Sequence, residues 1–98
     1  MKESEEETMQ IQIIVSGRVQ GVGFRYLTKI VADKIGVSGL VKNLSDGRVY
    51  IEASGEENKI STFIDAVKKS PTPSGRVDTC DVTYHTTNQK TKGFQVTY

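Results

Sequence analysis

The chain has 98 residues, a length that suits one domain with a single hydrophobic core and excludes two domains that each bury a core of their own. Its 13 Lys and Arg residues nearly balance 12 Asp and Glu residues, so the net charge gives no indication of a polyanionic partner such as nucleic acid. The one cysteine, Cys80, excludes an internal disulfide and a multi-thiolate metal site, which suits a reducing compartment, so we expect a cytoplasmic protein.

The first residues, 1–9, predict an acidic and disordered N-terminal tail. Met1 to Thr8 contain four glutamates and one lysine but no apolar run, so this segment is neither a signal peptide nor a membrane span. An acidic docking segment is the alternative to a solvated tail. We therefore expect the folded domain to span residues 10–98 and to make no contact with a membrane. We expect the protein to be a monomer.

The segment 10–36 predicts a strand, a glycine loop and a helix, in that order. Ile11, Ile13 and Val15 alternate with polar residues, as in a strand with one buried face. After the loop from Gly17 to Gly23, Gly36 stands at the C-cap position of a helix. The helix is indicated by apolar residues at helical spacing, namely Phe24, Leu27, Ile30, Val31 and Ile35.

The next segment predicts a hairpin and a second helix. A short strand that starts at Leu40 and Val41 and another over 49–53 flank the sequence Ser-Asp-Gly at 45–47, which supplies turn chemistry. Ser54 and Glu57 have the spacing of a capping box, which predicts where the second helix begins. The apolar pattern of this helix ends before the first of the two prolines.

The last third of the chain predicts two more strands. Val77 to Tyr84 reads as a fourth strand, and Phe94, Val96 and Tyr98 alternate in a short fifth one. The polar stretch from His85 to Lys92 is expected to be a loop. The order βαββαβ predicts an α+β sandwich of the ferredoxin-like kind, with a mostly antiparallel sheet and both helices on one face.

The glycine loop predicts an anion site. Glycines at 17, 21 and 23 let consecutive N–H groups point inward without interference from Cβ atoms. The helix that follows adds partial positive charge at its N-terminus, and Arg25 in its first turn adds a bidentate fork suited to phosphate oxygens. Glycines of an ordinary tight turn are the alternative. The spacing matches neither the Rossmann G-x-G-x-x-G nor a Walker A loop, so it gives no support to nucleotide binding by those routes.

Two segments resemble the signatures of the acylphosphatase family. Residues 15–25, with the sequence Val-Ser-Gly-Arg-Val-Gln-Gly-Val-Gly-Phe-Arg, match the first signature at every specified position. Residues 39–43, with the sequence Gly-Leu-Val-Lys-Asn, resemble the second one in register, as do the glycines at 47 and 55 that follow. Leu40 stands where the family usually has an aromatic residue, so we expect looser packing beside Asn43 but no loss of activity.

The resemblance implies a hydrolase that cleaves the carboxyl-phosphate bond of acyl phosphates to a carboxylate and inorganic phosphate. It implies that Asn43 orients the attacking water and that no metal, cofactor or covalent intermediate takes part. Inorganic phosphate is expected as both product and inhibitor. The phosphoryl group would be held by the Arg25 guanidinium and by the main-chain amides of Gln20, Gly21, Val22, Gly23, Phe24 and Arg25.

The chemistry of the leaving group agrees with this site. A carboxylate whose conjugate acid has a pKa of about 4 leaves without protonation, so no general acid is required. Neither signature contains a His, Cys, Asp or Glu, and only Asp46 of the neighbouring turn could swing in as a base. Cys80 is expected to fill space in a strand, and His85 to lie in a surface loop.

Other functions are known on the same fold. An RNA-recognition domain would carry stacking aromatics on its central strands, where this chain offers only Tyr50, and a metallochaperone would need C-x-x-C. A closer alternative is a domain that binds carbamoyl phosphate or passes it to a maturation enzyme, as the N-terminal domains of hydrogenase-maturation proteins do. Which acyl phosphate is the physiological substrate stays open at this point.

Overall fold

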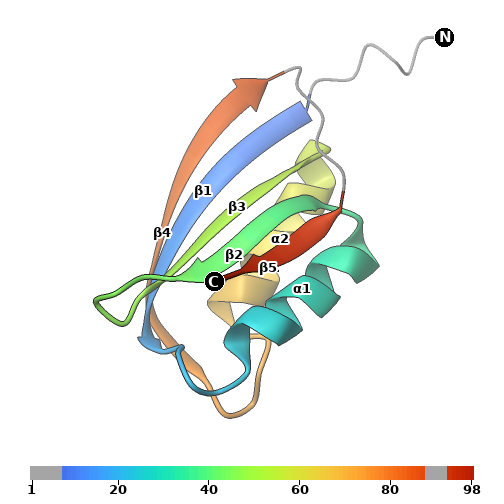
Figure 1. The fold of residues 1–98 in the computed structure, drawn as a ribbon. Coiled ribbons are helices and arrows are strands. Elements are labelled where there is room, and N and C mark those ends of the chain that lie inside the picture. Colours follow the sequence, from blue (N-terminus) through green and yellow to red (C-terminus); the bar gives the residue numbers. More distant parts are fainter. Residues whose placement is uncertain (1–7, 88–92) are drawn as a thin grey trace, which may run out of the picture.

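The computed structural model describes residues 8–87 and 93–98, which form one sheet covered on one face by two helices (Figure 1). The predicted α+β, ferredoxin-like arrangement with a short additional C-terminal strand is confirmed. In chain order the elements are β1 (Thr8–Arg18), α1 (Phe24–Ile35), β2 (Ser38–Asn43), β3 (Val49–Gly55), α2 (Glu57–Lys68), β4 (Arg76–Thr87) and β5 (Phe94–Thr97).

The sheet has the strand order β4-β1-β3-β2-β5 and is antiparallel except at one edge. β1 lies between β3 and β4, so that Ile13 pairs with Ile51 on one side and with Val82 on the other. β5 runs parallel to β2 and lies beside it at the edge of the sheet (Figure 1). The C-terminal residues are therefore placed beside the strand that carries Asn43.

The core lies between the sheet and the two helices. Alternate residues of β1 are fully buried, as the predicted period of two requires. Phe63 of α2 and Phe94 of β5 pack at a centroid distance of 5.8 Å in a tilted arrangement, which anchors the short edge strand to the core. The buried apolar residues are Ile11, Ile13, Val15, Val19, Phe24, Ala32, Val37, Val41, Val49, Ile51, Ala53, Ile60, Phe63, Ile64, Val67 and Phe94.

Several predicted strands are too short: β2 begins at Ser38 rather than at Leu40, and β3 continues to Gly55. β1 begins at Thr8 rather than at residue 10, and β4 continues to Thr87. His85 is thus a strand residue that pairs with Gln10, not the loop residue that its polar neighbours predicted. Cross-strand pairing outweighs the polar composition here, because β1 supplies partners as far as residue 8. The rest of the predicted loop, 88–92, and of the predicted tail, 1–7, lies outside the described residues.

The predicted capping box of α2 is wrong. Ser54 lies in β3, where it pairs with Gln10 of β1 and Ser38 of β2. The helix begins at Glu57, and its N-cap residue, Glu56, makes no side-chain cap hydrogen bond. Sheet pairing therefore extends through the residue that the sequence pattern assigned to the cap.

Neither helix in the described residues is long and apolar enough to cross a membrane.

The first helix, α1, ends as predicted, with Gly36 in the left-handed region at φ 97°. The main-chain N–H of Gly36 donates to the carbonyl of Ala32, 2.8 Å away, which satisfies one of the last carbonyls of the helix.

Thr28 on α1 gives a test of the packing. Its side chain is 1 % exposed, and its hydroxyl oxygen has no hydrogen-bond partner among the described residues. Thr28→Val keeps the branched shape and removes the unpaired hydroxyl, so we expect the free energy of unfolding to rise by about 1 kcal/mol. For a domain of this size that corresponds to a melting temperature higher by about 5 °C.

Urea denaturation of the two proteins measures this change. The matched control is Thr62→Val on α2, where the hydroxyl is exposed and donates to the carbonyl of Asn58 at 3.0 Å. The control should give no gain in stability. A loss of stability in Thr28→Val would mean that the buried hydroxyl has a partner after all.

Candidate active site

The loop between β1 and α1 leaves main-chain N–H groups free. Gly21 and Gly23 have φ values of 77° and 80°, a region of backbone conformation that residues with a Cβ atom rarely adopt. In the described part of the chain, the N–H groups of residues 20–25 make no hydrogen bond to another protein group. The carbonyl of Val22 accepts from the hydroxyl of Thr72 at 3.1 Å. Because the peptide is planar and trans, the N–H of Gly23 points in the opposite direction.

The N-terminus of α1 has no anionic partner of its own. Its N-cap residue is Gly23, which offers no side-chain oxygen, and its first turn contains no acidic residue. The other helix, α2, has Glu57 in the corresponding turn. The partial positive charge of α1 therefore stays available to an external anion.

Arg25 lies in this same first turn, where a second positive charge is electrostatically unfavourable. Its side chain is contacted by two groups near the C-terminus, the carbonyl of Thr97 and the exposed ring of Tyr98. Its Nη1 donates to the carbonyl of Thr97 at 2.9 Å, and its guanidinium carbon lies 4.6 Å from the centre of the Tyr98 ring. The Thr97 hydroxyl in turn donates to the carbonyl of Val41 at 3.3 Å, which ties this end of β5 to β2.

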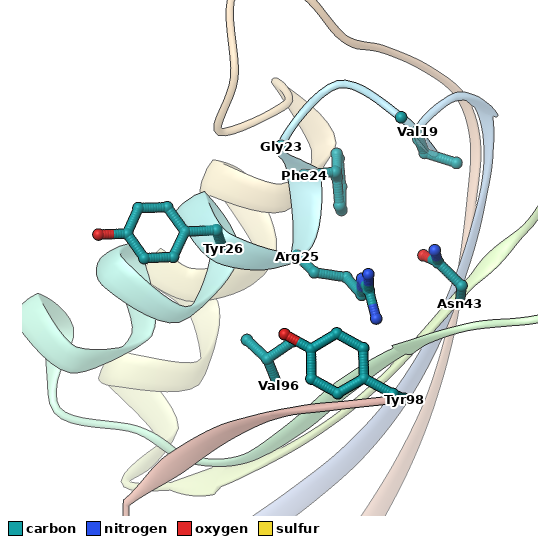
Figure 2. Close-up of a pocket in the computed structure, with 9 residues that line it drawn as sticks. Val19, Gly23, Phe24, Arg25, Tyr26, Asn43, Val96 and Tyr98 are labelled. Carbon is teal, nitrogen blue, oxygen red and sulfur yellow. The ribbon is translucent and has the colours of Figure 1, made fainter.

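A cavity of about 200 Å³ lies between the loop, α1 and the ends of β2 and β5. Figure 2 shows the Arg25 guanidinium and the Asn43 carboxamide facing the same space from different elements. Asn43 reaches it as the last residue of β2, where it pairs with Val49. The cavity is lined by Val19, Gly21, Gly23, Phe24, Arg25, Tyr26, Asn43, Val96 and Tyr98.

Most of the predicted site residues meet in this cavity, and two do not line it. Phe24 lines the cavity as well as belonging to the core, and the residue is 1 % exposed, whereas Val22 and Gln20 do not line it. Val22 packs against the core. The side chain of Gln20 turns to the hairpin instead, where its amide nitrogen donates to two main-chain carbonyls.

The sequence reasoning missed the contribution of the C-terminal strand. Thr97 and Tyr98 contact Arg25, and Val96 lines the cavity, but the alternation of this segment predicted only that it is a strand. Its parallel pairing with β2 is what brings it to the site, and a period of two contains no information about partners. No signal in the sequence identifies these residues as site residues.

Asp46 lies outside the cavity and already has a partner. Its carboxylate accepts hydrogen bonds from the Arg48 main-chain N–H at 3.1 Å and from Arg48 Nε at 2.8 Å. The main-chain hydrogen bond lowers the pKa of Asp46, and the Arg48 guanidinium lowers it further. A carboxylate with a lowered pKa is a weaker base, so its environment does not favour proton transfer.

Other reactive side chains are also away from the cavity. Burial raises the pKa of Cys80, which keeps its thiol protonated and agrees with a space-filling role. His85 lies on β4, paired with Gln10. In the segments 8–87 and 93–98, no three His, Cys, Asp or Glu residues gather closely enough to hold a metal ion.

Leu40 does not lie beside Asn43 as the sequence suggested. Leu40 pairs with Glu52, whereas its neighbour Val41 pairs with Ile51 and is fully buried under the helices. Because successive strand side chains point to opposite faces, Leu40 projects to the open face of the sheet and Asn43 to the helical face. The unusual residue at position 40 is thus separated from the cavity by the sheet itself.

Comparison with known proteins identifies the family. The acylphosphatase family model matches residues 11–96. The acylphosphatase of Enterococcus faecalis is 47% identical over 87 residues, which cover 89% of this chain and 96% of that one. The crystal structure of acylphosphatase from Bacillus subtilis superimposes with a TM-score of 0.87 at 44% identity, over 92% of this chain and 99% of the other.

The same domain also occurs within a larger protein. The structure of full-length HypF, in its phosphate- and nucleotide-bound form, matches with a TM-score of 0.83 at 35% identity. That match covers 93% of this chain but only 12% of HypF. Because the likeness to free-standing acylphosphatases extends over nearly their whole length, the chain is an enzyme of the acylphosphatase family.

Proposed function

We propose that the enzyme hydrolyses acyl phosphates by direct attack of water on the phosphorus atom, with no covalent intermediate. Arg25 and the loop 20–25 would hold the phosphoryl group, and Asn43 would orient the attacking water. The observation that carries this proposal is the placement of the Arg25 guanidinium and the Asn43 carboxamide at one cavity, beside the uncapped N-terminus of α1.

The loop and Arg25 supply the positive charge that a phosphoryl group requires. Free main-chain N–H groups at the start of α1 are donors that can point at phosphate oxygens, and the helix dipole favours a negative charge there. One N–H of Arg25 is engaged by Thr97, which leaves the remaining donors of the guanidinium for the substrate. Fixed donors of this kind stabilise charge that accumulates on the phosphoryl oxygens in the transition state.

The cavity contains no strong base among its described residues, so the proton of the attacking water needs another acceptor. We propose that a phosphoryl oxygen of the substrate takes it. The departing carboxylate, whose conjugate acid has a pKa of about 4, leaves as an anion and needs no proton from the enzyme. Asn43 then has one task, which is to hold the water in line with the bond that breaks.

Variants of Arg25 and Asn43 should differ in how they affect phosphate binding and turnover. Arg25→Ala removes a charged partner that acts on the phosphoryl group throughout, so phosphate affinity and turnover of benzoyl phosphate should both fall steeply. Arg25→Lys should restore little, because an ammonium on a flexible stem does not reproduce the planar fork. Asn43→Ala should lower turnover by a factor on the order of 10² and leave phosphate affinity nearly unchanged.

Calorimetric titration with inorganic phosphate and single-turnover hydrolysis, on variants whose fold is checked by circular dichroism, give the two quantities. Tyr84→Ala is a suitable control, since Tyr84 is an exposed aromatic on β4 that does not line the cavity. If Asn43→Ala lost phosphate affinity as severely as Arg25→Ala, Asn43 would be a phosphate ligand rather than the residue that orients water.

Asp46 tests whether the turn supplies a base. Since its carboxylate is occupied by Arg48 and has a lowered pKa, Asp46→Asn should retain turnover within about a factor of two. The pH dependence of kcat/KM on benzoyl phosphate should also keep its shape. A loss of the acidic limb of the wild-type profile in this variant would identify Asp46 as the missing base.

Metal dependence tests the composition of the site. Amide, guanidinium and carboxamide groups need no divalent ion to stabilise a phosphoryl group, so dialysis against EDTA should leave the hydrolysis rate unchanged. The measurement compares initial rates before and after dialysis. Loss of activity that Mg²⁺ restores would show that this set of groups is incomplete.

A further inference from the structure

The side chain of Gln20 links the phosphate-binding loop to the hairpin that follows Asn43. Its Nε2 donates to the carbonyl of Leu44 and to the carbonyl of Arg48, both at 2.8 Å. Leu44 directly follows Asn43 at the end of β2, and Arg48 directly precedes β3. One amide group thus spans both ends of the turn.

The two carbonyls that Gln20 contacts are also bonded within the turn. The carbonyl of Arg48 accepts from the N–H of Leu44 at 2.8 Å, and the carbonyl of Leu44 accepts from the N–H of Gly47 at 3.2 Å. A carbonyl oxygen can accept two hydrogen bonds, so the Gln20 amide supplies the second hydrogen bond to each of these two oxygens. Because both partners are acceptors, only the nitrogen of the amide can face them, and both of its hydrogens are used.

The position of Gln20 in the chain gives this link a consequence for the site. Gln20 is bonded through the main chain to Gly21, which lines the cavity, and Leu44 is bonded in the same way to Asn43. On its other side the loop is tied at Val22, whose carbonyl accepts from Thr72. The loop is thereby held between the hairpin and the segment after α2.

We propose that Gln20 is a positioning residue that sets the location of Asn43 relative to the phosphoryl group. This inference rests on the proposed function, because it assigns Gln20 an effect that passes through the water held by Asn43. A displacement of about 1 Å in a reacting group can lower a rate by a factor on the order of 10². The two hydrogen bonds from Gln20 to the turn next to Asn43 oppose such a displacement.

A double-mutant cycle tests the inference. Gln20→Met keeps the length of the side chain and removes both N–H donors. We expect its single-turnover rate on benzoyl phosphate to fall by roughly a factor of ten, while its affinity for inorganic phosphate changes by less than about a factor of three. In an Asn43→Ala background the same change should lower the rate by less than about a factor of two, because the oriented water is already lost.

Gln12→Met is the matched control. Gln12 is an exposed glutamine on β1 that pairs with Glu52 and Thr83, away from the cavity, so its replacement should leave both quantities unchanged. Urea denaturation of each variant gives the folded fraction at assay conditions, to which the rates are normalised.

Gln20→Glu gives a second readout, taken as the single-turnover rate at saturating substrate and normalised to the folded fraction at each pH, so that neither substrate repulsion nor unfolding accounts for it. A protonated carboxyl can donate one hydrogen bond to the turn, whereas a carboxylate donates none and repels both carbonyls. The ratio of the variant rate to the wild-type rate should therefore fall as the pH rises from about 4 to about 7, through the range in which a glutamate titrates.

The outcomes that overturn the inference differ from those that overturn the proposed function. Normal turnover in Gln20→Met beside an impaired Asn43→Ala would refute the positioning role alone. The positioning role would also be refuted if Gln20→Met lowered the rate equally in the wild-type and Asn43→Ala backgrounds. It would be refuted as well if Gln20→Met lowered phosphate affinity by as large a factor as the rate. Normal turnover in Asn43→Ala would instead refute the water-orienting role of Asn43, and the inference would fall with it.

Discussion

The site depends on holding a guanidinium at the N-terminus of a helix, where its charge is repelled by the helix dipole. Left to itself, Arg25 in the first turn of α1 would be free to turn its charge toward solvent. The carbonyl of Thr97 and the ring of Tyr98 favour the inward position, since one accepts its N–H and the other lies against its face. The two positive contributions add at one place, where a bound anion such as a phosphoryl group would relieve the repulsion between them.

This constraint explains why the short fifth strand matters. β5 has only four residues, yet it pairs in parallel with β2, and Phe94 packs on Phe63 in the core. Burying a side chain such as Phe94 contributes about 2 kcal/mol, which together with the pairing to β2 offsets the entropy cost of ordering a short edge strand. The same β2 ends at Asn43. One strand pair therefore supports both Asn43 and the groups that contact Arg25.

What the sequence predicts well is local. The alternation of Ile11, Ile13 and Val15, the glycine at the end of α1 and the two signatures predicted the elements and the residues that meet in the cavity. Features that depend on which strands lie side by side are predicted poorly. His85 and Ser54 became strand residues because β1 extends to meet them, and the contacts of Tyr98 depend on which strand lies beside it. A periodic pattern specifies the face of a strand but not its neighbour.

The groups that line the cavity also limit the chemistry open to the enzyme. In the described part of the chain they include a guanidinium, a carboxamide, main-chain amides and the phenols of Tyr26 and Tyr98, but no Asp, Glu, His or Cys side chain. Such a site can hold a phosphoryl group and a water molecule, but it has no strong acid to protonate a leaving oxygen. An alkoxide is far more basic than a carboxylate, and the available side-chain acids at the cavity, the phenols of Tyr26 and Tyr98, are weak. We therefore expect acyl phosphates, whose leaving group needs no proton, to be hydrolysed faster than alkyl phosphates, without any contact to the acyl group.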